Sequence, residues 1–414
     1  MTGTDGLRAW LIEAYRNDSI TGRRRGVAFA CLAAILIALL LYQIYFSLFH
    51  AEVNFDFFFY VGSAYRLFGD GAVTPLAYVQ DVLSSEIQWY DISKAIEGSP
   101  YVQEVMTNAE AFSKQLPYYT IKPVYPALME ILHGFGFEYL QASIIISAGA
   151  YVLIILLAWL CLAHGLPSFS IGAVFVAILL ALYNPLYELS RYSTPDTLNT
   201  ALIVLSAYLA FRRDQWIAAA LVSLFAIYIR PDSILWIGSL SVCYVLAKGL
   251  SLRAAGKAGA VCAIAVLAYF SLRLIDEPYS ILLLQKIFFS PMTADSAHPD
   301  RITDYHNLAE IAARYWNATL GLFTGKFFSE LYLFQTMLAV AGLAVCRRHR
   351  WDQESLWFIA ALICMVAFHL VMPKEHDRVL IFAHVLILIG LGRLTINFYA
   401  ANTPPHAGHL VRAP

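Results

Sequence analysis

The sequence predicts an all-α integral membrane protein with about ten transmembrane helices and a helical first exoplasmic loop. Its composition is the first reason: the 414 residues are 59% hydrophobic and 14% charged, whereas a soluble domain is close to half apolar and a quarter charged. Long uncharged runs recur along the chain, and lysine and arginine collect in alternate loops. The net charge of −1 gives no argument for a nucleic-acid partner.

The first apolar run, residues 27–49, contains no charged residue and is long enough to cross a hydrocarbon core of about 30 Å. It follows a polar segment that ends in Arg23-Arg24-Arg25. A cleavable signal peptide has a shorter apolar core and a small-residue cleavage site, so we interpret the run as a retained signal anchor. Within residues 1–26, apolar residues recur at helical spacing, which predicts an amphipathic cytoplasmic helix on the membrane surface.

The other apolar runs complete a predicted membrane domain over residues 27–396, followed by a cytoplasmic tail at 397–414. These runs lie at 142–163, 171–187, 198–211, 216–229, 234–247, 258–274, 327–345, 355–372 and 379–396. All six cysteines fall inside apolar runs or at their basic ends, without the spacing of a disulfide framework or a metal site.

The loop charges predict the orientation of this domain. Basic clusters at 23–25, 212–213, 248–257 and 347–350 all fall on one side of the membrane in the ten-helix count. The opposite side holds the long loop 51–141, with eleven acidic and four basic residues, and the acidic loop 275–326. Because lysine and arginine favour cytoplasmic loops, we expect both termini in the cytoplasm and both long loops outside the plasma (inner) membrane.

With that topology, the ionisable residues near the outer helix ends form one set. Its members are Asp56, Lys122, Arg191, Asp196, Arg230, Asp232 and the run Lys374-Glu375-His376-Asp377-Arg378. Charges at membrane depth are unfavourable, so those that persist there are functional candidates. Asp56 stands out because it lies among four phenylalanines, and burial against apolar rings favours proton exchange by a carboxyl group near neutral pH.

Structural interpretations remain open for the members of this set. Arg230 and Arg378 are also placed to snorkel from helix ends, and Asp196 and Asp232 each follow a proline at a helix start, where N-capping explains them. The run 374–378 also fits a short solvated loop. His298 and His306 lie among aspartates in the second long loop, but without recognisable metal-ligand spacing.

Several short segments resemble the GT-C superfamily of membrane glycosyltransferases, which use lipid-phosphate-linked sugars. The resemblance extends over residues 27–396. The segments are Phe55-Asp56-Phe57 with Tyr60, Ala64 and Gly69; Lys122-Pro-Val-Tyr-Pro-Ala-Leu128; Ser193-Thr-Pro-Asp-Thr-Leu198; Ile229-Arg-Pro-Asp-Ser-Ile-Leu235; and His376-Asp-Arg-Val-Leu380. Similar members include protein O-mannosyltransferases, the aminoarabinose transferases of lipid A, and bacterial mannosyl- and arabinosyltransferases. The paired acidic residues of some members are absent, because Asp56 is flanked by phenylalanines.

The resemblance implies an inverting transfer of a sugar from a polyprenyl-phosphate donor to a hydroxyl of a glycan, lipid or protein. By position, Asp56 takes the role of general base. Arginine's planar fork suits phosphate oxygens, so Arg230 and Arg378 are the first candidates for the donor phosphate, with Arg191, Lys122 and Lys374 behind them. The remaining candidates are expected to contact substrate: Glu52, Tyr60, Asp196, Asp232 and His376.

No cofactor is predicted. A phosphate monoester leaves with its charge already formed and can be stabilised by arginine, so a divalent metal is possible but not indicated. Two other functions stay open. A lipid-linked polysaccharide ligase or polymerase would also place arginines and histidines in an outer loop. A membrane transporter or flippase predicts inverted repeats and interrupted helices at mid-membrane.

Overall fold

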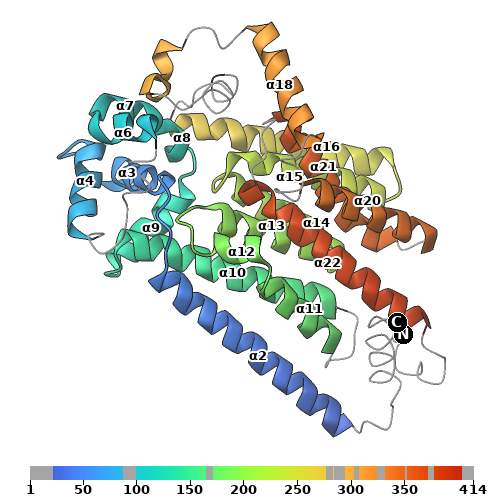
Figure 1. Ribbon diagram of the computed structural model, residues 1–414. Coiled ribbons are helices and arrows are strands. Elements are labelled where there is room, and N and C mark those ends of the chain that lie inside the picture. The colour runs from blue at the N-terminus through green and yellow to red at the C-terminus, as the bar shows by residue number, and fades with distance from the viewer. Residues whose placement is uncertain are drawn as a thin grey trace.

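The computed structural model describes residues 22–86, 99–164, 171–276, 283, 294–302, 307–323, 332–349, 352–371 and 377–402 (Figure 1). Within these ranges the chain is nearly all helical and contains no strand; an isolated bridge joins Glu52 to Tyr192. The all-α prediction is confirmed. The predicted amphipathic segment before residue 22 and the tail after 402 lie outside the described residues.

A bundle of long helices forms the larger part of the molecule. It consists of α2 (Gly22–Phe49), α10 (Tyr139–Ala163), α11 (Ile171–Ala181), α12 (Asn184–Leu189), α13 (Asp196–Phe211), α14 (Trp216–Ile227), η1 (Pro231–Ser233), α15 (Ile234–Ala247), α16 (Leu252–Ser271), η2 (Leu272–Leu274), α20 (Tyr332–His349), α21 (Asp352–Val371) and α22 (Asp377–Asn402). Where the predicted apolar runs fall on described residues they are mostly helical; residues 327–331 of one run lie outside the described ranges.

Several of these helices are long and apolar enough to cross a membrane. They are the stretches Gly26–Phe49, Tyr139–Ala163, Leu252–Leu274, Asp352–Val371 and Leu380–Phe398. Four further apolar helices are shorter: Ile171–Ala181, Asp196–Phe211, Trp216–Ile227 and Pro231–Ala247. The chain is therefore a membrane protein by the length and composition of its helices, while the count of ten spans stays a prediction.

The predicted run 171–187 is not one helix. It divides into α11 and α12, and Tyr183 between them is extended, with φ −70° and ψ 108°. Pro185 lies in the first turn of α12. Proline lacks the N–H that a continuing helix needs, but it fits the first turn of a new one. The break follows from this proline, which the apolar pattern alone does not reveal.

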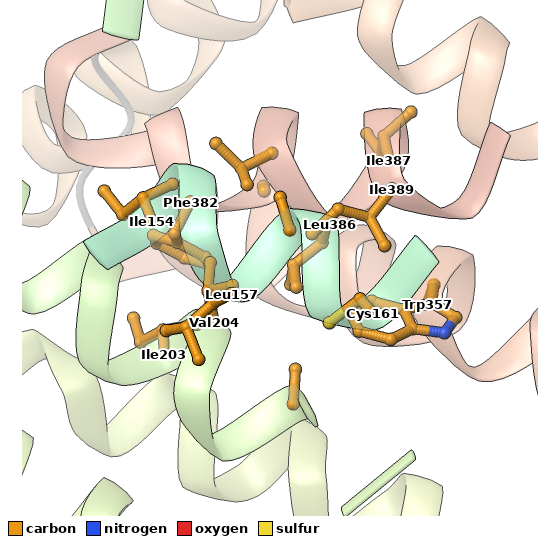
Figure 2. Packing of buried hydrophobic residues seen from close by; sticks show 14 of the residues in the cluster. Ile154, Leu157, Cys161, Ile203, Val204, Trp357, Phe382, Leu386, Ile387 and Ile389 are labelled. Atoms are coloured by element: carbon orange, nitrogen blue, oxygen red, sulfur yellow. The ribbon is translucent and has the colours of Figure 1, made fainter. Parts of the chain in front are cut away.

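Apolar packing between α10, α13, α21 and α22 forms the core of the bundle (Figure 2). Ile154 and Leu157 of α10 lie beside Ile203 and Val204 of α13 in this view. The helices approach closely where small residues allow it. A Cβ atom added at Gly390 would lie 2.8 Å from the Phe358 ring, so glycine is required there for α22 to pack against α21.

A buried charge network joins four helices at one end of the bundle. Glu354 of α21 accepts hydrogen bonds from Arg212 Nη1 (3.1 Å) and from Asn397 Nδ2 (3.1 Å), and Arg212 Nη2 makes a second contact with it. Arg393 Nη2 lies 3.4 Å from the same carboxylate, and its Nη1 donates to the Leu162 and His164 carbonyls at 2.9 Å. The Glu354 side chain is 6% exposed. We call this set the Glu354 network.

Glu354→Ala is expected to destabilise the protein by about 3–5 kcal/mol, because it leaves two buried guanidinium groups without their shared carboxylate. Asp352→Ala is the matched control, since Asp352 lies in the same first turn but is exposed. Thermal and chemical unfolding in detergent measure the difference. Equal stability of the two variants would show that the network does not hold these helices together.

A second, smaller unit covers the other end of the bundle, and we call it the cap. Its helices are α3 (Asp56–Phe68), α4 (Pro75–Ser85), α6 (Pro100–Thr107), α7 (Ala109–Gln115), α8 (Pro117–Thr120) and α9 (Val124–Gly134). A proline in the first turn sets the start of α4, α6 and α8. Phe57, Phe59 and Phe112 are among the residues of its separate apolar core. The predicted first loop is therefore a folded helical unit.

The second long loop packs onto the first. Its described segments are η3 (Ala294–Ala297), η4 (Pro299–Arg301) and α18 (Leu308–Phe323). His298 Nε2 lies 3.0 Å from Glu104 Oε1, and Lys114 Nζ lies 2.9 Å from Asp300 Oδ2. Gln115 Nε2 donates to the Ala297 carbonyl at 3.2 Å. Residues from both predicted loops thus form one cap.

The contact between His298 and Glu104 predicts how the cap responds to pH. The His298 hydrogen bond, and next that of Asn108, lower the pKa of the Glu104 carboxyl. A lowered pKa means that this carboxylate stabilises the folded state above its unfolded pKa of about 4.3, and that the stabilisation is lost as the pH falls through the folded pKa. Glu104→Gln is therefore expected to speed amide hydrogen exchange over residues 296–302 at pH 7, and to reduce the acid dependence below pH about 4.3 to the part that Asp300, paired with Lys114, contributes.

The exposed Asp81, on α4 of the same cap, supplies the control. Asp81→Asn should leave amide hydrogen exchange over residues 296–302 unchanged, both at pH 7 and below pH about 4.3. If the Glu104 variant also exchanges at the wild-type rate, the pair does not attach the second loop to the cap.

Candidate functional site

Asp56 is the first residue of α3, at the junction between α2 and the cap. Asn54 Oδ1 accepts a hydrogen bond from the Asp56 backbone N–H at 3.2 Å. An acidic residue in a first helical turn is favoured by the helix dipole, which gives Asp56 a structural role as well. The residue is only 7% exposed. A carboxylate with so little contact with solvent depends on protein donors.

Three buried tyrosines lie within electrostatic reach of this carboxylate, and we call the group the tyrosine pocket: Tyr101, Tyr119 and Tyr125. The Tyr119 hydroxyl donates to Asp56 Oδ1 at 2.9 Å. Burial first, and then the Asp56 charge, raises the pKa of Tyr119 well above its usual value. The pKa values of Tyr101 and Tyr125 are raised as well, chiefly by burial, with a contribution from the Asp56 charge. All three phenols stay protonated at neutral pH, so Tyr119 remains a donor.

The pocket is built by stacked rings that come from α3, α7 and α8. The Phe59 ring stacks on Phe112 and Tyr119, with centroids 5.0 and 4.5 Å apart. A Cβ atom at Gly62 would lie 2.8 Å from the Phe112 ring, so glycine lets α3 approach α7. Tyr60 is 2% exposed and meets Tyr119 edge to face at 5.1 Å. The apolar residues around Asp56 therefore form the scaffold that fixes Tyr119.

Lys122 extends the site toward the bundle. Its Nζ lies 4.8 Å from the centre of the Tyr119 ring and 5.6 Å from that of Tyr60, and it donates to the Tyr60 hydroxyl at 3.4 Å. Ammonium groups are attracted to the faces of aromatic rings. Since Tyr119 also holds Asp56, one ring contacts both the predicted base and a cation.

Arg230, Asp196 and Asp232 form a compact ion-pair group that we call the arginine cluster. Arg230 Nε and Nη2 donate to the two Asp232 oxygens at 3.0 and 2.8 Å, and Nη1 contacts Asp196 Oδ1. Their side chains are 16%, 2% and 26% exposed for Arg230, Asp196 and Asp232. Ser233 Oγ donates to Asn199 Oδ1 at 2.7 Å, which joins η1 to the first turn of α13.

The arginine cluster and the tyrosine pocket belong to one region. The Val124 N–H donates to the Tyr228 carbonyl at 3.3 Å, which joins the start of α9 to the chain just before Arg230. Lys122 is close enough to act electrostatically on Asp232. The structure therefore brings together Asp56, Tyr60, Lys122 and the arginine cluster, as the sequence predicts, at the capped end of the bundle.

Arg191 and Glu52 lie in this region but bind each other. Arg191 Nη2 pairs with Glu52 Oε1 at 3.1 Å, Nη1 with Glu188 Oε2 at 2.9 Å, and Nε donates to the His50 carbonyl at 2.9 Å. The Glu52 N–H in turn donates to the Arg191 carbonyl at 3.0 Å. These contacts hold the C-terminal end of α2 against the C-terminal end of α12. They give Arg191 a structural role beside its predicted one.

The last predicted group is described only in part. Arg378 lies in the first turn of α22, which starts at Asp377. Lys374 and His376 lie outside the described residues, as do His306 and Asp304. His298, the other histidine of this loop, contacts Glu104, and Asp300 forms an ion pair with Lys114. Among the described residues, no group of His, Cys, Asp and Glu is arranged to hold a metal ion.

Asp276 is a carboxylate that the sequence did not single out. It follows η2 and accepts a hydrogen bond from Thr120 Oγ1 at 2.6 Å. Arg66 Nη2 lies 3.0 Å from its Oδ2, and the Asp276 side chain is 9% exposed. Consecutive residues of α8, Tyr119 and Thr120, thus bind Asp56 and Asp276. In the sequence, Asp276 lies at the edge of a predicted acidic loop, and nothing in that position distinguishes it from the neighbouring acidic residues.

Comparison with protein-family models, with curated proteins and with solved structures finds no match to this chain.

Tyr119→Phe is expected to lower the free energy of unfolding by about 1.5–3 kcal/mol, the usual range for a hydrogen bond to a charged group, because it removes a donor to a buried carboxylate. The ring stacking with Phe59 is retained in this variant. Tyr45→Phe is the control, since Tyr45 is exposed on α2 and keeps its ring contact with Phe49. Thermal unfolding in detergent gives the comparison, and equal midpoints would mean that the Tyr119 hydroxyl does not stabilise the cap.

Proposed function

We propose that the chain is an inverting glycosyltransferase that moves a sugar from a polyprenyl-phosphate donor to an acceptor hydroxyl at the outer face of the membrane. The observation that carries the proposal is the setting of Asp56. It is a carboxylate 7% exposed, held by Tyr119, with Lys122 against the same tyrosine ring. An acid and a cation at the end of a membrane bundle suit a reaction between a hydroxyl and a lipid phosphate.

In the proposed reaction the acceptor oxygen attacks the anomeric carbon from the face opposite the lipid phosphate. A new carbon–oxygen bond forms, the bond from that carbon to the phosphate oxygen breaks, and the acceptor proton moves to the Asp56 carboxylate. The anomeric configuration inverts, and the lipid phosphate leaves with the bonding electrons. A general base contributes about 10²–10⁴-fold to such a step.

Positive charge must stabilise the leaving phosphate. Lys122 lies against the faces of Tyr119 and Tyr60 and donates to the Tyr60 hydroxyl, which places a positive charge beside the proposed base. Arg230 is shared by two aspartates and carries no excess positive charge. Of the predicted phosphate ligands, Lys122 therefore fits best, and Asp196 and Asp232 suit the hydroxyl groups of a sugar.

We propose that an acceptor reaches Asp56 through a movement of the cap, because this residue is only 7% exposed. Tyr101, which lies beside the carboxylate, belongs to α6, and Glu104 of the same helix is held by His298 of the second loop. Displacement of the second loop would release α6 and expose the pocket. We propose further that both termini are cytoplasmic and that the cap faces the outside of the plasma membrane, as the distribution of lysine and arginine indicates.

A transporter is the second candidate, and the break between α11 and α12 favours it, because interrupted helices are common at transport sites. Beside the break, the Tyr183 hydroxyl lies 3.1 Å from His384 Nδ1. A transporter would move a labelled polyprenyl-phosphate sugar across the membrane of reconstituted vesicles without forming a glycoside.

Asp56→Asn is expected to reduce sugar transfer by about 10²–10⁴-fold while the protein still folds, because the amide cannot accept the acceptor proton. The assay uses purified protein with polyprenyl-phosphate mannose, glucose and arabinose as donors, and follows both glycoside formation and release of polyprenyl phosphate. Asp81→Asn, an exposed acid of the same cap, should retain full activity. Transfer at the wild-type rate by the Asp56 variant would sink the assignment of the base.

A further inference from the structure

A buried arginine in the second long loop has almost no counter-charge. Arg314 lies on α18 with its side chain 9% exposed. Within the part of the chain that the structure describes, none of its Nε, Nη1 and Nη2 atoms has a hydrogen-bond acceptor. The nearest carboxylate oxygen, Oε1 of Glu310 one turn before it, is 3.9 Å from Nε, and that side chain is 32% exposed.

The two faces of α18 differ sharply. Leu308, Trp316 and Leu320 are 80%, 65% and 41% exposed, and Ala312 completes this stripe of residues four apart. Glu310 and Arg314 are offset from the stripe by two positions, which is about 200° around a helix. An exposed apolar stripe that contains tryptophan is typical of a helix lying in the membrane interface. Arg314 therefore points away from the lipid side of α18 and toward the protein.

A hydrogen bond fixes the position of this part of α18 against the bundle. The Tyr315 hydroxyl donates to the Leu370 carbonyl at 2.6 Å, at the end of α21 away from the Glu354 network. Figure 1 shows α18, in orange, above α16 and α21 in this view, with the cap helices α7 and α8 to its left. Arg314, next in sequence to Tyr315, thus lies at the capped end of the bundle.

Arg230 and Arg191, which also lie at this end, are compensated. Arg230 contacts two aspartates, and Arg191 contacts two glutamates and a carbonyl. Burying a guanidinium group without an acceptor is unfavourable by several kcal/mol. Such a group is expected where an anion that is not part of the chain completes the site.

We propose that Arg314 binds a lipid-borne phosphate on the protein-facing side of α18, at the capped end of the bundle. The planar guanidinium fork matches two phosphate oxygens, and the apolar stripe of α18 places lipid tails within reach of the same helix. The phosphate belongs either to a prenyl phosphate or to a phospholipid headgroup. In the first case the inference deepens the proposed transferase, because Arg314 would then hold the donor phosphate or the released lipid phosphate.

The test measures binding without sugar transfer, so it is independent of the base assigned to Asp56. Probes are farnesyl phosphate and short-chain phosphatidic acid, with farnesol as the uncharged control, titrated into detergent-purified protein by calorimetry and by thermal shift. The variants are Arg314→Met and Arg314→Lys. Arg273→Ala is the matched control, since Arg273 is an exposed arginine in η2 at the same end of the bundle.

Wild-type protein and the Arg273 variant are expected to bind a phosphate probe, and both Arg314 variants to bind it about 10- to 100-fold more weakly. Arg314→Met should also raise the melting temperature of the ligand-free protein, because an uncompensated buried charge is replaced by an apolar side chain of similar volume. An arginine with a purely structural role would give the opposite sign. Preference for farnesyl phosphate or for phosphatidic acid identifies the source of the phosphate.

The proposal is overturned if wild-type protein binds neither phosphate probe, or if the Arg314 variants bind as tightly as wild type. If Arg314→Met does not fold, the binding measurement on Arg314→Lys tests the proposal, because lysine keeps the positive charge and lacks only the planar guanidinium group. If Arg314→Lys loses farnesyl phosphate binding and sugar transfer together, Arg314 holds the donor phosphate of the proposed reaction. If that variant loses phosphate binding but keeps sugar transfer, the phosphate site is separate from the reaction assigned to Asp56.

Discussion

The hydrogen bond from the Tyr119 hydroxyl to the Asp56 carboxylate is the contact on which the candidate site depends. It joins the first residue of the cap's first helix to its short helix α8, across 63 positions of sequence. The Tyr119 ring stacks on Phe59 and supports Lys122. A change that moves this ring would therefore displace an acid, a cation and part of the cap core together, so these positions are mechanically coupled.

Buried charged side chains lie at both ends of the bundle, but the two ends differ in how completely these side chains are paired with opposite charges. In the Glu354 network, a carboxylate is shared by two arginines and an asparagine, and backbone carbonyls take up the rest of Arg393. Such a network stabilises and needs no ligand. At the capped end, Arg230 is equally well paired, whereas Arg314 is buried with a single distant carboxylate. A buried charged side chain that lacks a counter-charge is therefore a better candidate for ligand binding than one that is buried and fully paired.

The sequence allows the fold to be predicted wherever a single physical rule determines the secondary structure. The candidate site could be predicted only in part. Uncharged runs such as 142–163 become helices because backbone groups must be satisfied internally in an apolar environment. The break at Tyr183 was missed, because it comes from a proline that apolar periodicity ignores. The pairing of Arg191 with Glu52 and the approach of Asp276 to Thr120 depend on tertiary contacts between distant segments. Arg314 was missed for a similar reason, since an arginine in an acidic loop looks solvated until its burial is known.

Opposing effects act on the ionisation of a carboxylate in the position of Asp56, and their balance decides whether it can serve as a base. Burial among phenylalanine and tyrosine rings favours the neutral acid. The positive end of α3 and a hydrogen bond accepted from a phenol favour the carboxylate. Tyr119 keeps its proton at neutral pH, so its hydroxyl can donate to Oδ1 and stabilise the ionised carboxylate. The same hydrogen bond also reduces the basicity of Oδ1, so in the proposed reaction the contact with Tyr119 has to lengthen before Asp56 can take the acceptor proton.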